Sequence, residues 1–120
     1  MTEMSDDSQI LDLDHLRRQT AGDRALEGEL LVLFEAQCAR LRPLVAEGLP
    51  SVERADAAHT VKGSAKAIGA WRLASLADSL ESALRSGAPE PALKTLVARF
   101  NDTIATTCRA VAERGRTAAA

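Results

Sequence analysis

His59 has neighbours that suit a nucleophilic imidazole. Lys62 follows it by three residues and Gly63 by four. In a helix these offsets place the three residues on one side of the cylinder. The ring would then have a cation beside it and bare backbone one turn away. Glycine costs a helix interior roughly 1 kcal/mol relative to alanine, so few purely structural needs explain this combination.

A helical projection places His59 on the exposed side of its helix. A helix turns by about 100° per residue. The residues that we assign to the core lie within one arc of about 80° and are Ala57, Val61, Ala65 and Ile68. His59 lies roughly opposite that arc, and the residues that share its side are Ala55, Gly63 and Lys66, with Lys62 on the flank. We therefore predict an exposed imidazole at the middle of its helix.

A lone histidine is usually an ordinary surface residue or a buried one with its hydrogen bonds satisfied. The exposed position removes the second option for His59, and the glycine and two lysines argue against the first. His15 has no such neighbours and is interpreted as an ordinary residue.

Glu81 is a candidate to orient the ring of His59. Gly69 would join two antiparallel helices, with His59 ten residues before it and Glu81 twelve residues after it. At about 1.5 Å per residue the two lie roughly 15 and 18 Å from the hinge, so they are nearly level. The carboxylate could accept a hydrogen bond from Nδ1–H and leave Nε2 free as a nucleophile. It could equally pair with Arg85 at position i+4, and the residues alone do not decide between the two.

The composition indicates one helical domain. Of the 120 residues, 46% are hydrophobic, but they include only two Phe, one Trp and no Tyr, so Ala, Leu and Val dominate. Such residues favour helices over strands. Two cysteines, Cys38 and Cys108, fall at apolar helical positions and suit a core better than a metal cluster or a disulfide framework.

The charge and the first residues exclude several classes of protein. A formal net charge of −2 gives no basic field for nucleic acid. Residues 1–8 are acidic and polar, unlike a signal peptide, and no apolar run approaches the length of a membrane span. We expect a cytoplasmic protein without a membrane partner.

Apolar spacing and turn residues predict an all-α protein. The residues that stop, cap or kink the expected helices are Gly22, Asp23, Pro43, Gly48, Pro50, Ser51, Gly69 and Gly87. Between them we expect a short helix over 12–21, a second helix that begins after Asp23 and is kinked near Pro43, and three more that begin near positions 51, 70 and 92. The fold class is an antiparallel up-down four-helix bundle with a short additional N-terminal helix. Its expected parts are a disordered lead at 1–9, the bundle at 10–114 and a frayed tail at 115–120.

One motif resembles a known family. The segment 59–65, His-Thr-Val-Lys-Gly-Ser-Ala, with Ile-Gly-Ala at 68–70, resembles the signature of histidine-containing phosphotransfer (HPt) domains of bacterial phosphorelays. The segments 31–34 and 76–81 resemble the flanking helices of that family. The likeness runs from about Leu11 to Val111.

The resemblance implies roles for individual residues. It implies that His59 is phosphorylated, that Lys62 and Lys66 neutralise the phosphoryl charge, and that Gly63 leaves room for the partner. Many members have Gln where this chain has Glu81. Ala65 stands where members often carry a second serine, which leaves Ser64 as the remaining hydroxyl candidate.

The expected activity is a phosphorelay shuttle. Phosphoryl transfer needs positioning and charge neutralisation more than covalent machinery. A receiver domain would supply the aspartyl phosphate and Mg²⁺, whereas this chain has no ATP-binding pattern and needs no metal or cofactor of its own. It would therefore be a phosphocarrier, not a kinase, and we expect a monomer. The expected docking patch, rimmed by lysines that include Lys66, consists of Val52, Ala55, Gly63 and Ala70.

Two other functions are less well supported by the sequence. A receiver-binding adaptor that accepts no phosphate would share the fold, but the intact His59 counts against it. A metal-dependent hydrolase is disfavoured because the two histidines are 44 positions apart and no Glu-x-x-His motif is present.

Overall fold

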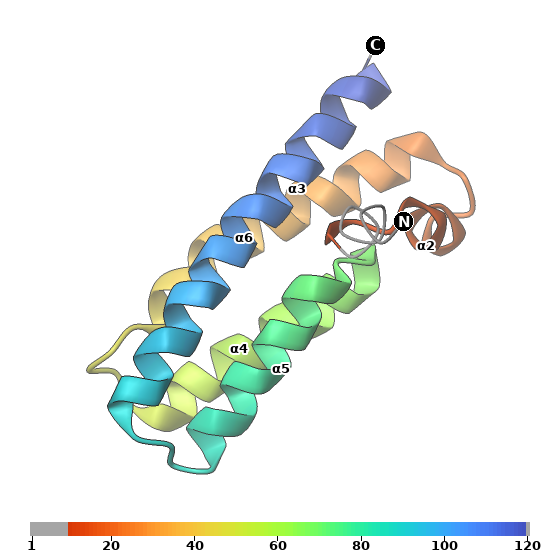
Figure 1. The fold of residues 1–120 in the computed structure, drawn as a ribbon. Helices are drawn as coiled ribbons and strands as arrows, with labels where there is room; N and C mark the ends of the chain where they lie inside the picture. The colour runs from red at the N-terminus through yellow and green to blue at the C-terminus, as the bar shows by residue number, and fades with distance from the viewer. Residues whose placement is uncertain (1–9, 120) are drawn as a thin grey trace, which may run out of the picture.

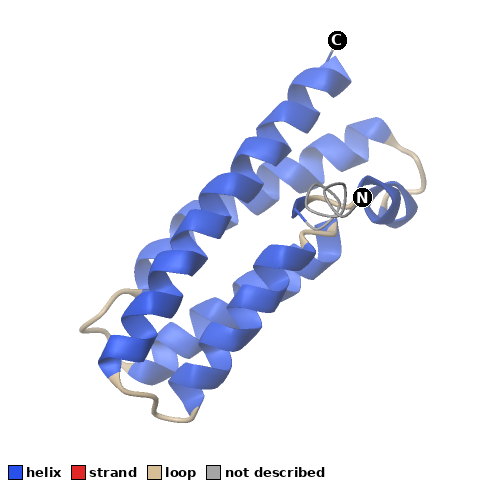
Figure 2. Cartoon of the chain, viewed as in Figure 1, coloured by secondary structure: helices blue, strands red, loops and turns tan. Residues whose placement is uncertain are grey.

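The computed structural model describes the backbone of residues 10–119 and the side chains of residues 10–116. Every secondary-structure element in this part is helical, and the elements are α2 (Leu13–Gln19), α3 (Arg24–Leu41), the 3-10 helix η1 (Arg42–Val45), α4 (Ser51–Ile68), α5 (Trp71–Arg85) and α6 (Glu90–Ala119). The four long helices form the predicted antiparallel bundle, and α2 lies beside the junction of α4 and α5 (Figures 1 and 2). The expected disordered lead at 1–9 lies outside the described residues. Within residues 10–119, no helix combines the length and apolar character needed to cross a bilayer.

Proline ends α3 where a kink was expected. The α-helix stops at Leu41, and the chain continues as η1 with Pro43 in its first turn. Proline has no N–H to donate to the carbonyl of Ala39, so the α-helical hydrogen bonding cannot continue through it. Arg42, the residue before it, keeps helical backbone with φ −54° and ψ −45°. The single helix expected through Pro43 is therefore observed as an α-helix followed directly by a 3-10 helix.

The helix starts follow from local capping. Asp23 caps α3 as predicted, since its side chain accepts a hydrogen bond from the amide of Leu26 at 3.0 Å. Ser51, expected as the cap of α4, is instead its first helical residue, and Pro50 occupies the cap position.

Gly69 joins α4 to α5 as expected. Its φ of 82° is in the left-handed region, and the amide of Ala70 returns to the carbonyl of Ala65 at 2.8 Å. The segment before α2 covers this turn, because the amide of Asp12 donates to the carbonyl of Gly69 at 2.9 Å. The indole of Trp71 donates to the Asp12 carboxylate at 2.9 Å. These bonds fasten the N-terminal segment across the hinge.

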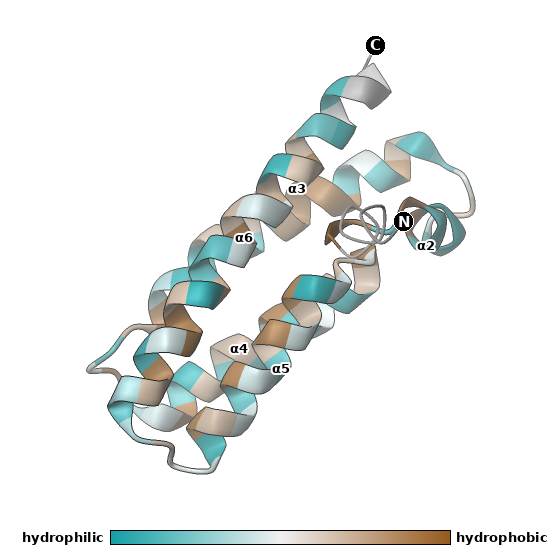
Figure 3. Cartoon of the chain, in the orientation of Figure 1, coloured by the Kyte–Doolittle hydropathy of each residue, from teal (hydrophilic) through white to brown (hydrophobic). Residues whose placement is uncertain are grey.

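Small side chains fill the seam between α4 and α5. Ala58 and Ala65 of α4 and Ala77 of α5 have no exposed surface. Larger side chains from all the long helices complete the core, among them Phe34, Val61, Leu73, Leu80 and Phe100. Figure 3 shows hydrophilic residues over the outward side of α2 and alternating hydrophilic and hydrophobic residues along α6. The short seam side chains let α4 and α5 approach closely, which sets the distance between their functional residues.

Helix α6 is longer than the sequence indicated. The expected frayed tail at 115–120 is helical as far as Ala119, so the boundary placed at 114 is not a helix end. The side chain of Arg114 reaches Glu27 of α3, with Nε 2.6 Å from Oε2, and Glu27 is buried. This ion pair attaches the last turns of α6 to the bundle.

Candidate functional site

His59 stands exposed in the middle of α4, as predicted. It is the ninth of the 18 residues of that helix, and 61% of its side chain is exposed. The bundle therefore holds the ring at a fixed height while leaving it open to solvent.

Glu81 of α5 contacts the ring. Nδ1 of His59 lies 3.2 Å from Oε1 and 3.1 Å from Oε2 of Glu81. An ionised carboxylate can only accept, so Nδ1 carries the proton that is shared with it. In the neutral imidazole Nε2 then keeps its lone pair, and Nε2 has no partner among the described residues. The prediction that His59 and Glu81 lie nearly level on adjacent helices is confirmed.

The Glu81 carboxylate also binds two cations. Nζ of Lys62 lies 3.0 Å from Oε1, and Nε of Arg85 lies 2.8 Å from Oε2. The two alternatives left open by the sequence are both realised, because Glu81 contacts His59 and Arg85 together. Burial would raise the pKa of Glu81, but the hydrogen bonds from Lys62, Arg85 and His59 outweigh it and lower the pKa to about 2. Glu81 is therefore a carboxylate at any physiological pH.

Two aspartates complete this network. Asp78 lies 3.0 Å from Nζ of Lys62, and Asp56 lies 3.1 Å from Nη2 of Arg85. The bonds to Glu81 first and then to Asp78 raise the pKa of Lys62, which stays an ammonium. Neither aspartate was predicted as a site residue from the sequence. Asp78 could have been predicted from its distance to the hinge. Lys62 lies seven residues before Gly69 and Asp78 nine residues after it, so the two are nearly level on adjacent antiparallel helices.

Gly63 is exposed, and its vicinity is open. A Cβ built on it would meet no heavy atom within 4 Å in the described part of the chain, apart from its own helix backbone. Packing within this chain therefore does not require glycine there.

Val52 and Lys66 extend the same face of α4. Each lies seven residues from His59, which returns to within about 20° of it on the helix. Both are exposed, and Lys66 takes part in no ion pair among the described residues. The predicted face thus contains Val52, His59, Gly63 and Lys66.

Three predicted site residues lie elsewhere. Ala55 and Ala70 are only 1% and 0% exposed, so neither can line a docking patch. The projection assumed one buried arc, but α4 is covered by α5 on one side and by α3 and η1 on another, and Ala70 lies next to the hinge turn that Asp12 covers. Ser64 is five residues from His59, or about 140° around the helix. Its hydroxyl donates to the side chain of Gln37 on α3, so it faces away from the ring.

Apolar side chains of α3 lie beside α4. Leu33 and Val32 are 66% and 64% exposed. Leu33 and Ser64 line a hollow of about 560 Å³ between the two helices. This apolar flank was not part of the predicted docking patch.

Comparison with known families decides the class of the protein. A model of the Hpt domain matches residues 29–113, which include α4 and α5 with all the site residues described above. The chain belongs to the Hpt domain family. Hpt domains act in phosphotransfer within phosphorelays, where they interact with receiver domains and are phosphocarriers instead of kinases. No curated protein and no solved structure gives a significant match to the chain.

Proposed function

We propose that His59 receives a phosphoryl group from the aspartyl phosphate of one receiver domain and passes it to the aspartate of another. The P–O bond to the first carboxylate breaks as the P–Nε2 bond forms, and the return step reverses these changes. The proton stays on Nδ1 beside Glu81 throughout. The observation that carries the proposal is the exposed ring whose Nδ1 is bonded to Glu81 while Nε2 is open.

Glu81 supports this chemistry by orienting the imidazole. A carboxylate that accepts from Nδ1–H selects the tautomer with a lone pair on Nε2. Since Lys62 and Arg85 offset its charge, the carboxylate can serve this role without repelling an incoming phosphate strongly. Lys62 would turn from Asp78 toward the phosphoryl oxygens once Nε2 is phosphorylated, and Lys66 would add a second cation from the same helix face.

The face of α4 suits a docking receiver domain. Gly63 leaves clearance beside His59, and Val52 and Lys66 lie along the same face, with Leu33 of α3 at its flank. We expect the receiver to bring its own Mg²⁺, so that the Hpt chain contributes no metal ligand and needs no ATP. We also expect it to act as a monomer.

Transfer from a charged receiver tests the proposal. A receiver domain is phosphorylated with ³²P-acetyl phosphate and mixed with the Hpt chain, and the label on the chain is measured. The wild type should acquire a base-stable and acid-labile phosphate, and His59→Gln should acquire none at unchanged helicity. His15→Gln is the matched control and should still be labelled. Receiver binding without any label on the wild type would favour the adaptor function instead.

A further inference from the structure

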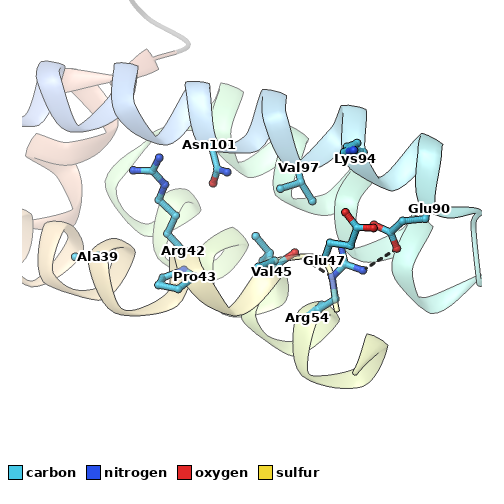
Figure 4. Close-up of a pocket in the computed structure, with 11 residues that line it drawn as sticks. Ala39, Arg42, Pro43, Val45, Glu47, Arg54, Glu90, Lys94, Val97 and Asn101 are labelled. Carbon is cyan, nitrogen blue, oxygen red and sulfur yellow. Dashed lines mark hydrogen bonds and ion pairs between the residues drawn. The ribbon is translucent and has the colours of Figure 1, made fainter. Parts of the chain in front are cut away.

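A second hollow lies away from His59, between α6 and the stretch that runs from the end of α3 through η1. Its volume is about 680 Å³. One wall is a stripe of α6 with residues spaced by four, three and four, from Glu90 through Lys94 and Val97 to Asn101. At 1.5 Å per residue this wall is about 16 Å long, so the mean cross-section is roughly 40 Å². We name it the η1–α6 groove; Figure 4 shows Arg54 with Glu90 at one end and Arg42 with Asn101 at the other.

Buried polar atoms without partners lie at both ends of the groove. Arg54 is 2% exposed; its Nε donates to the carbonyl of Val45 at 2.9 Å, and its Nη1 lies 3.3 Å from Oε1 of Glu90. Nη2 of Arg54 and Oε2 of Glu90 have no partner among the described residues, and neither has Oδ1 of Asn101. Folded proteins leave few buried polar atoms unpaired. The groove therefore has one donor group, Nη2 of Arg54, and two acceptor atoms, on Glu90 and Asn101, without partners.

An extended peptide meets these requirements. Its backbone alternates N–H donors and C=O acceptors, and at about 3.3 Å per residue five residues span the 16 Å of the groove. An alkyl chain would offer no donor to Glu90 or Asn101. A polyamine would offer no acceptor to Arg54 and would also face the cations Arg42 and Lys94.

The lining residues indicate the side chains of such a peptide. Val45 and Val97 face each other across the middle of the groove, which favours a small apolar residue there. Arg42 and Lys94 are exposed and form no ion pair among the described residues. Three cations line the groove against the two carboxylates of Glu47 and Glu90, which favours acidic residues toward the ends of the peptide.

We propose that the η1–α6 groove binds an extended segment of about five residues from a partner protein, with an apolar centre and acidic ends. Arg54 projects from α4 at about 140° from His59, because five residues separate them. The groove is therefore a second binding site that a bound receiver need not cover.

A titration with a synthetic peptide tests this site. The probe is acetyl-Asp-Ser-Val-Ser-Asp-amide, added to the ¹⁵N-labelled full chain and followed by amide chemical shifts. Saturable shifts should be confined to residues that line the groove. Asn101→Leu, which removes one unpaired acceptor, should weaken binding about three- to tenfold. Lys94→Ala should weaken it as well, and Arg99→Ala, an exposed arginine of α6 outside the groove, should leave it unchanged.

Several outcomes would overturn the proposal. They are the absence of saturable shifts, shifts spread over other surfaces, equal binding of a peptide with Lys in place of Asp, and stronger binding of decanoate or spermidine to the groove. Lys94→Ala changes an exposed side chain, so the test stands even if Asn101→Leu does not fold. His59→Gln should bind the peptide like the wild type, which separates this result from the outcome of the phosphotransfer test.

Discussion

Nδ1 of His59 lies 3.1 Å from Oε2 of Glu81, across the seam between α4 and α5. The alanines of that seam bring the two helices close enough for a histidine and a glutamate to meet at the bundle surface. The same carboxylate is fixed from its other sides by Lys62 and Arg85. The imidazole is therefore oriented by a group that is itself held in place.

Substitution of Glu81 should change the tautomer of His59. In Glu81→Ala the ring loses its acceptor, so the population with the proton on Nδ1 should fall and phosphotransfer should slow about tenfold. Glu81→Gln keeps a carbonyl acceptor and should retain both the tautomer and most of the rate. The ¹⁵N shifts of the ring report the tautomer, and single-turnover transfer from a charged receiver reports the rate. An unchanged tautomer in Glu81→Ala would show that the contact does not orient the ring.

The depressed pKa of Glu81 predicts a pH dependence of stability. The pKa falls from 4.5 to about 2 on folding, because the bonds from Lys62, Arg85 and His59 outweigh the opposing effect of burial. A lowered folded pKa stabilises the protein above the unfolded value and loses that contribution as the pH falls. The free energy of unfolding should therefore decrease between about pH 4.5 and pH 2, in part through this group.

Urea unfolding at a series of pH values measures that contribution. Glu81→Gln cannot titrate, so its free energy of unfolding should fall less steeply than that of the wild type over this interval. The difference between the two curves isolates Glu81 from the other carboxylates. Parallel curves would mean that Glu81 has the same pKa in both states.

Asp78 should compete with the phosphoryl group for Lys62. Its carboxylate lies 3.0 Å from Nζ and is largely exposed. Asp78→Asn should free the ammonium and lengthen the lifetime of phosphorylated His59 about two- to fourfold, the range of a surface ion pair. Lys62→Met should shorten the lifetime, and Lys94→Met, a lysine of α6 remote from the site, should not affect it. The decay of ³²P label on isolated chains gives these lifetimes; equal decay in all variants would remove Lys62 from the phosphoryl site.

The parts of the fold that local chemistry determines were predictable. The observed bounds of α4, Ser51–Ile68, differ by one residue at the start from the helix expected to follow a Ser51 cap, because Pro50 and Gly69 are adjacent to its apolar pattern. The similar distances of His59 and Glu81 from one hinge predicted that they lie nearly level, and the contact that the sequence left open is observed.

The parts that depend on how distant segments cover each other were not predictable. The burial of Ala55 and Ala70 requires a knowledge of where η1 and the Asp12 segment lie. The bond from Ser64 to Gln37 joins residues 27 positions apart on helices whose rotation no local signal specifies. A projection of one helix shows which residues share a side but not how many neighbours that helix has.

Gly63 and Gly69 should respond in opposite ways to alanine. Gly63 has ordinary helical backbone and open surroundings, so Gly63→Ala should raise the free energy of unfolding by about 0.5–1 kcal/mol. Gly69 has a φ of 82°, and a Cβ there would lie 3.0 Å from both the Cβ and the carbonyl oxygen of Asp12. Gly69→Ala should therefore lower that free energy by about 1–3 kcal/mol. Urea unfolding measures both changes.

The glycine at position 63 should matter to the partner instead of to the fold. Gly63→Gln keeps a good helix former, so the chain should stay folded. Its side chain would fill the space beside His59 that a docking receiver needs, and a small displacement of the reacting groups is costly in phosphotransfer. The rate of transfer from a charged receiver should fall about tenfold or more. Thr60→Gln, on the same helix, should lower this rate less, because Thr60 already carries a side chain. Equal rates for Gly63→Gln and the wild type would mean that the receiver approaches His59 from another side.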